Sequence, residues 1–344
     1  MPRTLGWDVG GAHLKAALAE DDRLLKVWQK PTPIWQGLEH LETALSAILA
    51  ESEAAGGAER HAITMTGELS DIFASRREGV EQLTRIFCER LSGDIVLYGG
   101  AAGFLSAGHA RAHAGEIASA NWHASAALAA SSIEEALFLD MGSTTTDILP
   151  VLNGAVRASA TSDAERLAAG ELVYQGYTRT ALMAVARRVP MAGRTIPVMN
   201  ELFATMADVQ RVIETLEEED DLYPAADNGE KTPEGSRRRL ARMVGMDAHE
   251  ASDGAWEWLA HAFAEAQLRL IHDAALQVLS RDELSDDASV VIAGAGRPVL
   301  RRLAARLDRG VVDFSDLFDC PADLRDAACR AAPAAALALL AARS

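Results

Sequence analysis

The chain contains LGWDVGGAHLK at Leu5–Lys15 and, much farther along, LFLDMGSTTTD at Leu137–Asp147. When one stretch is slid onto the other, Asp8 falls on Asp140, and a glycine of the first turn coincides with the glycine of the second. Each stretch has an apolar run, an Asp-x-Gly turn and a second apolar run, and a further turn and a third apolar run follow. Runs of this kind predict two β-meanders built on one plan.

The two turns have the chemistry of a site for phosphate groups and their metal ion. Glycine lets backbone N–H groups approach an anion, and a carboxylate at a strand end suits hydrated Mg²⁺. We therefore predict that Asp8 and Asp140 are catalytic residues and hold one Mg²⁺ between facing turns. A third glycine-bearing turn follows the apolar run Val290–Ala293 and precedes a predicted helix. The predicted phosphate-binding residues of the three turns are Gly10, Gly11, Lys15, Gly142, Ser143, Thr144, Thr145, Gly294, Gly296 and Arg297.

The composition predicts a soluble protein and argues against two classes of partner. The 344 residues are enough for two lobes, and 49% of them are hydrophobic. The net charge of −17 argues against nucleic acid and against an anionic membrane surface. The three cysteines lack a C-x-x-C spacing, and the N-terminus lacks the pattern of a signal peptide. These features predict a cytoplasmic location with reduced thiols.

The remaining segments alternate between strands and helices, which favours an α/β fold with a largely parallel sheet. A capping-box pattern at Ser162 and Glu165 predicts the start of a helix, and residues 217–233 read as an acidic loop. Further strands are expected at residues 62–66, 95–98 and 290–293. Helices are expected at residues 35–55, 79–91, 117–130, 199–216, 252–279 and 297–307.

The three glycine-bearing turns, in this order, resemble those of the superfamily that includes acetate kinase, sugar kinases, actin and heat-shock chaperones. DVGG and DMGSTTTD are similar to its hydantoinase/oxoprolinase branch. The resemblance implies a duplicated, ribonuclease H-like fold of the two-lobed actin-like ATPase class, with a helical insertion in the second lobe. It implies a first lobe at residues 1–133, a second lobe at 134–160 and 287–344, and an inserted substrate region at 161–286.

Longer sequence motifs are similar to those of one subgroup of that branch, which is linked to tetrahydromethanopterin-dependent one-carbon metabolism. They are ITMTGEL at Ile63–Leu69, ASANW at Ala118–Trp122, AAGELVY at Ala168–Tyr174 and FATMADV at Phe203–Val209. This resemblance implies a transferase of alkyl or aryl groups that acts in methanofuran biosynthesis. Such an enzyme would join the phenol of γ-glutamyltyramine to (5-aminomethylfuran-3-yl)methyl diphosphate and release diphosphate.

That chemistry assigns further roles to residues of the sequence. A phenol has a pKa of about 10, so it needs a base or a cation to ionise near neutral pH. His13 and Asp147, at the far ends of the two turns, are equal candidates for that catalytic role. The inserted region would recognise the organic substrate, and the predicted substrate-binding residues are Tyr174, Arg179, Thr205 and Asp208.

An ATP-dependent kinase and an oxoprolinase-type hydrolase are the alternative functions, and a nucleotide-sensing partner protein is a third. Kinases of the superfamily usually have threonine after the glycine pair of the first turn, where this chain has Ala12. The missing hydroxyl weakens the prediction that ATP or another nucleotide is a ligand. The expected ligands are therefore small diphosphate and γ-glutamyltyramine-like molecules with Mg²⁺, and assembly as a homodimer is left open.

Overall fold

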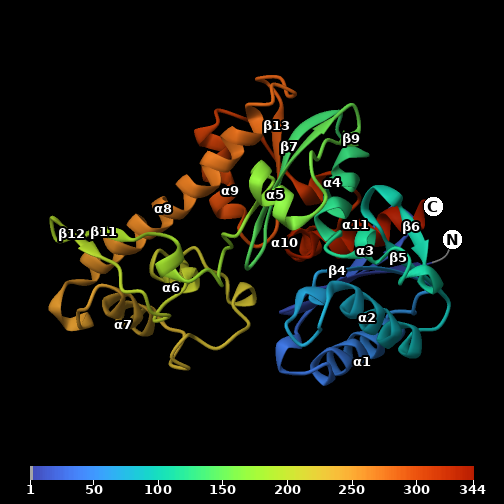
Figure 1. Cartoon of the computed structure of the whole chain (residues 1–344), viewed down its shortest axis with the longest axis horizontal. Coiled ribbons are helices and arrows are strands. Elements are labelled where there is room, and N and C mark those ends of the chain that lie inside the picture. The colour runs from blue at the N-terminus through green and yellow to red at the C-terminus, as the bar shows by residue number, and fades with distance from the viewer. Residues whose placement is uncertain (1–2) are drawn as a thin grey trace. The chain divides into compact units, whose positions relative to one another are not determined.

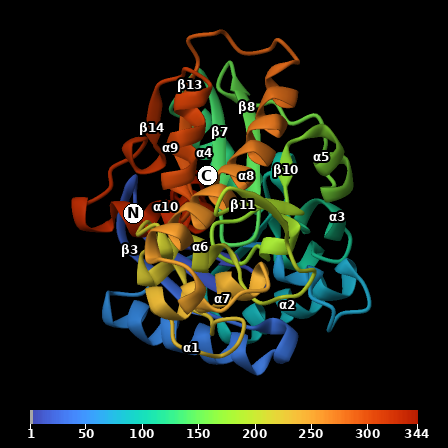
Figure 2. The same ribbon diagram turned by 90° about the vertical axis from the view of Figure 1, so that its left-hand side faces the viewer.

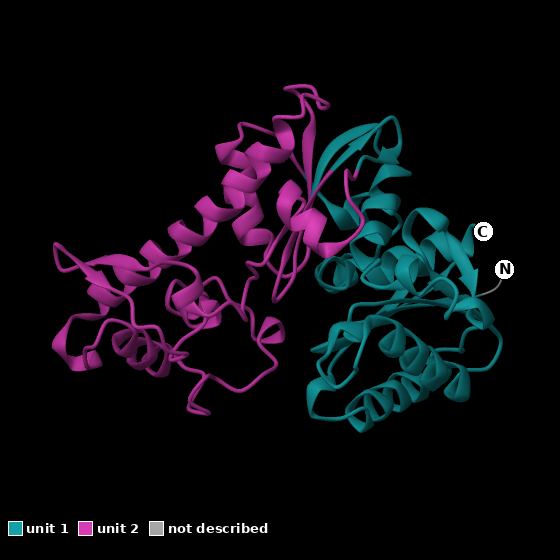
Figure 3. Cartoon of the chain, viewed as in Figure 1, with its two compact units in different colours: residues 1–138, 150–157, 312–344 teal, residues 139–149, 158–311 magenta. Residues whose placement is uncertain are grey.

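The computed structural model describes residues 3–344, and the chain divides into two compact units (Figure 3). One unit contains residues 1–138, 150–157 and 312–344, and the other contains residues 139–149 and 158–311. The described residues form two six-stranded sheets and one two-stranded hairpin. The fold is therefore mixed α/β, as expected, whereas the lobe boundaries drawn from the sequence stay a prediction.

The first sheet begins with the predicted meander, in which β1, β2 and β3 pair antiparallel. Strands β4 and β5 then add to the free side of β1 in parallel, and β6 closes the sheet antiparallel. Only two of the five pairings are thus parallel, so the expectation of a largely parallel sheet is wrong here. The strands are β1 (Arg3–Val9), β2 (His13–Glu20), β3 (Arg23–Pro31), β4 (Arg60–Met65), β5 (Asp94–Tyr98) and β6 (Phe104–Ser106).

The second sheet repeats the strand order of the first. Its meander β7, β8 and β9 corresponds to β1, β2 and β3, and β13 and β14 continue from β7 as β4 and β5 continue from β1. This shared order confirms the duplicated fold that the two sequence stretches predict. The strands are β7 (Glu135–Met141), β8 (Thr146–Leu152), β9 (Ala155–Val156), β13 (Ser289–Ala293) and β14 (Val311–Asp313), and β10 (Leu172–Val173) also pairs with β8.

Alternation along β1 directs its side chains to two different helical layers. The buried Trp7 ring makes an edge contact with Phe87 of α2 at a centroid separation of 5.6 Å. On the other face, a Cβ at Gly6 would lie 2.1 Å from the Ala334 carbonyl oxygen of α11, so glycine permits this close packing. Figure 1 shows α1 and α2 on one side of the sheet and α11 on the other. The helices of this unit are α1 (Glu39–Ala54), α2 (Arg76–Arg90), α3 (Ala114–Ile117), α4 (Asn121–Ala130), α10 (Arg325–Arg330) and α11 (Ala332–Ala342).

In the second unit, other helices pack against the long helix α8. This helix begins after the predicted cap Ser252 and runs for 27 residues. Trp256 and Phe263 of α8 are buried in an apolar cluster with residues of α6, α7 and the hairpin β11–β12. Figure 2 shows α6, α7 and β11 close to α8. Among the described helices, none has the length and apolar character that crossing a bilayer requires. The elements are α5 (Asp163–Ala169), α6 (Met206–Val212), α7 (Pro233–Met243), α8 (Asp253–Leu279), α9 (Arg297–Arg306), β11 (Arg188–Met191) and β12 (Arg194–Pro197).

Two of the predicted helices are shorter than the sequence suggests. The helix expected at 199–216 is limited to α6, because the preceding backbone pairs with other segments: Met199 N–H donates to the Met243 carbonyl, and the Ala204 carbonyl accepts from Leu182. The helix expected at 117–130 is interrupted by Ser119, whose φ of 54° is left-handed. At the first place tertiary pairing takes backbone groups that a helix would need, and at the second Ala118 forms a β-bridge with Met65 immediately before the left-handed residue.

Candidate functional site

The first acidic turn is a tight backbone loop that is tied to a neighbouring segment. Gly10 N–H donates to the His13 carbonyl at 3.0 Å, which closes the turn between β1 and β2. The Gly11 carbonyl accepts from Ile34 N–H at 3.2 Å, and the Ala12 carbonyl accepts from Thr32 N–H at 2.8 Å. A Cβ at Gly11 would meet no atom within 4 Å, so space beside this backbone is open. The turn is therefore held in place and accessible on one side.

Asp8 lies at the end of β1, with 5% of its surface exposed. Its cross-strand neighbour in β2 is Lys15, so the two side chains share one face of the sheet. The Lys15 ammonium donates to the Arg330 carbonyl at 2.8 Å, which points it toward the end of α10. His13 begins β2 and is 8% exposed. The first turn thus brings together the predicted carboxylate, the cation and one candidate base.

Residues that the sequence prediction missed lie beside the first turn, at the carboxyl end of β4. Thr66 N–H donates to the Val9 carbonyl at 3.0 Å, and a Cβ at Gly67 would lie 3.1 Å from the same oxygen. The next residue, Glu68, is 1% exposed and accepts from the Ser119 hydroxyl at 2.9 Å. The parallel pairing of β1 and β4 brings their carboxyl ends together, and ligands of α/β proteins commonly bind there. The motif TGEL at Thr66–Leu69, which follows a predicted strand, is the sequence feature from which these residues could have been predicted.

The second acidic turn carries the hydroxyl groups expected of it. Gly142 N–H donates to the Thr145 carbonyl at 2.9 Å, so this turn closes in the same way as the first. Ser143, Thr144 and Thr145 are half-buried, and the hydroxyls of Ser143 and Thr144 lie 3.4 Å apart. Hydroxyls at a glycine-bearing turn can donate to phosphate oxygens together with backbone N–H groups.

A segment from farther along the chain packs directly on this second turn. Tyr177 N–H donates to the Gly142 carbonyl at 2.9 Å, and Arg179 N–H donates to the Ser143 carbonyl at 2.9 Å. A Cβ at Gly176 would lie 2.3 Å from the Thr144 nitrogen, so only glycine allows this approach. Arg179 is consequently placed at the turn, with its Nη1 3.4 Å from the Thr144 hydroxyl.

The third glycine-bearing turn also lies against the second. Gly296 N–H donates to the Met141 carbonyl at 2.9 Å and immediately precedes α9, which begins at Arg297. Gly294 has a φ of +83°, and a Cβ there would lie 2.5 Å from Oδ1 of Asp140. The predicted grouping of Asp140 with both glycines is therefore present within this unit, and Asp140 is 9% exposed.

Asp147 lies at the other end of the second turn but is held in a buried ion pair. Its carboxylate accepts from the Arg166 guanidinium at 2.6 Å, and Arg166 is 1% exposed. Burial raises the pKa of the Asp147 carboxyl, and the Arg166 charge opposes that rise. This pairing gives Asp147 a structural partner in α5, and its assignment as a catalytic base stays a prediction.

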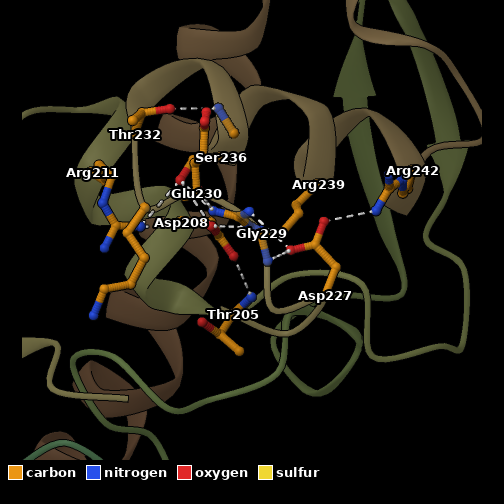
Figure 4. Close-up of polar contacts among 12 residues, drawn as sticks. Thr205, Asp208, Arg211, Asp227, Gly229, Glu230, Thr232, Ser236, Arg239 and Arg242 are labelled. Carbon is orange, nitrogen blue, oxygen red and sulfur yellow. Dashed lines mark hydrogen bonds and ion pairs between the residues drawn. The ribbon is translucent and has the colours of Figure 1, made fainter. Parts of the chain in front are cut away.

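The four predicted substrate-binding residues have different surroundings. Tyr174 is 60% exposed, and Arg179 is exposed beside the second turn. Thr205 caps α6, and its N–H donates to Asp208 at 3.0 Å, which completes a capping box. Asp208 also accepts from Arg239 at 2.7 Å (Figure 4). The last two residues thus have structural tasks, and substrate contact by any of the four stays a prediction.

The acidic loop between α6 and α7 is anchored by a network of ion pairs. Asp227 accepts from Arg239 at 3.1 Å and from Arg242 at 3.0 Å, both of which belong to α7 (Figure 4). Asp221 pairs with Arg211 of α6. The loop is therefore fixed to the two helices that flank it.

Across residues 3–344, no group of three or more His, Cys, Asp or Glu side chains is arranged to hold a metal ion. Each acidic turn instead offers one buried carboxylate, Asp8 or Asp140. Mg²⁺ commonly keeps several waters and takes one or two carboxylates together with substrate phosphates. The residues present fit that manner of binding. A separate hollow beside α5 is lined by Ala158, Ser159, Ala160, Thr161, Glu165, Ala168 and Ala169, which are not predicted site residues.

Comparison with known proteins assigns the chain to a family. The profile of the hydantoinase/oxoprolinase family matches residues 59–314. The chain belongs to the hydantoinase/oxoprolinase family. This member is 30% identical over 298 residues to the (4-{4-[2-(gamma-L-glutamylamino)ethyl]phenoxymethyl}furan-2-yl)methanamine synthase of Methanocaldococcus jannaschii, covering 86% of this chain and 87% of the relative. It is 28% identical to the Methanococcus vannielii protein of the same name over 173 residues, which is 50% of this chain and 76% of that relative.

A solved structure supports the fold of this family member. The nucleotide-free structure of acetone carboxylase matches with a TM-score of 0.58 and 11% identity, over 97% of this chain and 70% of that one. This likeness concerns the fold alone. Together with the repeated strand order of the two sheets, it agrees with the duplicated α/β fold expected from the sequence.

Proposed function

We propose that this protein is a transferase of methanofuran biosynthesis, which joins the phenol of γ-glutamyltyramine to (5-aminomethylfuran-3-yl)methyl diphosphate. The observation that carries the proposal is the 30% identity to the Methanocaldococcus jannaschii synthase over 86% of the chain. The two glycine-bearing acidic turns support it, because diphosphate leaves readily only when its developing charge is neutralised.

In the proposed reaction, the phenol oxygen attacks the furan-bound methylene carbon and forms the ether bond. The bond between that carbon and the diphosphate oxygen breaks, and diphosphate leaves with the electron pair. The open backbone at Gly11 in the first turn and the hydroxyls of Ser143 and Thr144 in the second would bind its oxygens. Bound Mg²⁺, held through water by the predicted ligands Asp8 and Asp140, would neutralise charge on the leaving group.

The phenol must lose its proton as the ether bond forms. The two candidates from the sequence now differ, because Asp147 is paired with the buried Arg166. His13 lies at the first turn, and imidazole is the side chain that most often acts as a general base. We therefore assign His13 the role of accepting the phenol proton.

The experiment incubates the purified protein with both substrates and Mg²⁺, and it measures diphosphate and the ether product in one sample. Equal amounts of diphosphate and ether, formed only when both substrates are present, are the expected result. Diphosphate release without the phenol would indicate a hydrolase instead, and the absence of both products would refute the proposed transferase.

The kinase or hydrolase alternative is favoured by the complete set of hydroxyls at Ser143–Thr146. Titration calorimetry with Mg-ATP distinguishes it from the preferred function. Because Ala12 lacks the hydroxyl that kinases of the superfamily usually place there, we expect weak binding of Mg-ATP and no substrate-stimulated ADP release. Tight binding followed by ADP release would favour the alternative.

A further inference from the structure

Thr66 begins the motif TGEL and lies beside the first acidic turn. Its N–H donates to the Val9 carbonyl at 3.0 Å, and a Cβ at Gly10 would lie 3.8 Å from its hydroxyl oxygen. Thr66 follows β4, which pairs in parallel with β1, so the carboxyl ends of the two strands meet at one edge of the sheet. A hydroxyl from a neighbouring strand is therefore placed against a glycine of the turn.

The Thr66 hydroxyl takes no part in the hydrogen bonding of residues 3–344. Thr66 is the N-cap of the short 3-10 helix Gly67–Leu69, a position at which a threonine side chain commonly accepts from a backbone N–H, yet it makes no such bond here. No other described residue is its hydrogen-bond partner either, and Thr66 is half-buried. This hydroxyl is therefore available to a ligand.

The backbone that carries the hydroxyl is held in place by its neighbours. A Cβ at Gly67 would lie 3.1 Å from the Val9 carbonyl and 2.8 Å from Cδ1 of Ile34, so glycine permits this close packing. The next residue, Glu68, is buried and accepts from the Ser119 hydroxyl at 2.9 Å. A donor on a fixed backbone loses little freedom when it binds a ligand, and this favours a binding role.

The first acidic turn has no hydroxyl of its own. Gly10, Gly11 and Ala12 all lack one, whereas the second turn has three in succession at Ser143–Thr145. An anionic ligand needs donors on the side of each turn, and the net charge of −17 makes that need greater. Thr66 provides such a donor from the end of β4.

We propose that Thr66 is a further substrate-binding residue, whose hydroxyl donates to an oxygen of the diphosphate group at the first turn. The motif TGEL thereby provides the hydroxyl that Ala12 lacks, from outside the turn itself. The identity of the diphosphate substrate rests on the proposed function, whereas the placement of the hydroxyl rests on contacts within one compact unit.

The first test measures binding of inorganic diphosphate with Mg²⁺ to the full-length protein by titration calorimetry. Thr66→Val keeps the shape of the side chain and removes the hydroxyl, so it should weaken binding about tenfold, as expected for one hydrogen bond to a charged group. Thr66→Ser keeps the hydroxyl and should bind within about twofold of the original affinity. Equal affinities of the valine and serine variants, or no binding by the unmodified protein, would overturn the proposal.

Thr43→Val is the matched control for the loss of a threonine hydroxyl. Thr43 is exposed on α1 of the same unit, and its hydroxyl donates to the Glu39 carbonyl at 2.7 Å. This variant should bind diphosphate as the unmodified protein does. A loss equal to that of Thr66→Val would refute a specific role of Thr66.

Urea unfolding separates ligand contact from support of the fold. Because the Thr66 hydroxyl has no partner among the described residues, Thr66→Val should unfold at the same urea concentration as the unmodified protein. Weaker diphosphate binding with unchanged unfolding is the expected combination. A lower unfolding midpoint that Thr66→Ser restores would show that the hydroxyl supports the fold and would refute the binding role.

These measurements do not depend on ether formation. If Thr66→Val alone loses diphosphate binding while the unmodified protein forms no ether, the proposed function fails and the assignment of Thr66 stands. If ether forms and all variants bind diphosphate equally, the assignment of Thr66 fails alone.

Discussion

Asp8 and Asp140 occupy the same position in two copies of one strand-and-turn pattern, but their neighbours differ. Asp8 shares a sheet face with Lys15, whereas Asp140 lies against the backbone of Gly294. Both carboxylates are at least nine-tenths buried. Each carboxylate lies near the end of a strand, beside a glycine-bearing turn, which is the position that the predicted metal-binding role requires.

Replacing either carboxylate by the amide of the same shape tests its predicted role. Asp8→Asn and Asp140→Asn should each lower kcat about 100-fold or more. An uncharged amide would bind Mg²⁺ more weakly than a carboxylate, so less positive charge would be available to stabilise the leaving diphosphate. Circular dichroism should show an unchanged fold. Asp71→Asn and Asp287→Asn, at exposed positions of the two units, are the controls and should retain full turnover. Unchanged turnover of the Asp8 and Asp140 variants would contradict the metal role.

Glycine at position 294 is required both by close packing and by a left-handed φ, and the two effects on stability can be measured separately. Gly294 and Gly193 both have a left-handed φ, but a Cβ at Gly294 would lie 2.2 Å from the Met141 carbonyl, whereas a Cβ at Gly193 would meet no atom within 4 Å. Gly193→Ala should therefore cost about 1 kcal/mol of unfolding free energy through strain alone. Gly294→Ala should cost more, by about 2 kcal/mol or above, and should also reduce diphosphate binding. Urea unfolding of both variants measures the difference, and equal losses would contradict the packing argument.

At the scale of elements, most strands and helices followed from the sequence because their patterns are local. The two meanders have short turns and long apolar runs, and Ser252 caps α8 where it was expected. The hairpin β11–β12 was missed because its short strands contain two prolines, and α7 was missed because it follows an acidic loop.

The site was only partly predictable, for a related reason. The glycines and hydroxyls of the turns are local features, so their grouping could be inferred from strand ends. The contacts of Gly176 and Tyr223 with that region depend on how distant segments pack, and no periodicity in the sequence reports them. Two tryptophans of α8 show the same limit: Trp256 is buried, whereas Trp258, two residues later, lies on a different helix face and is exposed.

A buried histidine at the start of β4 makes the stability of the first sheet depend on pH. His61 is 4% exposed, and its Nδ1 accepts from the Trp7 indole N–H at 3.2 Å. Burial lowers the pKa of His61 from 6.5 to about 4, against an opposing hydrogen bond to the Ser92 backbone. The folded protein thus favours neutral His61. Its contribution, of order 3 kcal/mol, is present above pH 6.5 and is lost as the pH falls from 6.5 toward 4.

Unfolding free energies measured across this pH range test the assignment. His61→Asn keeps an oxygen acceptor for Trp7 and should remove much of the decline between pH 6.5 and 4. His249→Asn, at an exposed position, should leave the decline intact. If both variants show the same pH dependence as the original protein, His61 does not titrate as the structure implies.

At the scale of the whole molecule, the duplicated fold and the negative net charge both affect how an anionic substrate can bind. Two sheets with one strand order each present an acidic turn, yet the chain carries a net charge of −17 that repels anionic substrates. Binding of a diphosphate therefore needs local compensation from backbone N–H groups, hydroxyls, a metal ion and a few placed cations. Salt should screen the overall repulsion, so moderate ionic strength should not abolish substrate binding.

The path of the phenol oxygen tests the central claim most directly. γ-Glutamyltyramine labelled with oxygen-18 at the phenol is incubated with the furanmethyl diphosphate, Mg²⁺ and the protein, and the products are examined by mass spectrometry. The proposed transfer predicts that the ether retains the label and that the released diphosphate contains none. Label in the diphosphate, or the absence of any ether, would contradict the account.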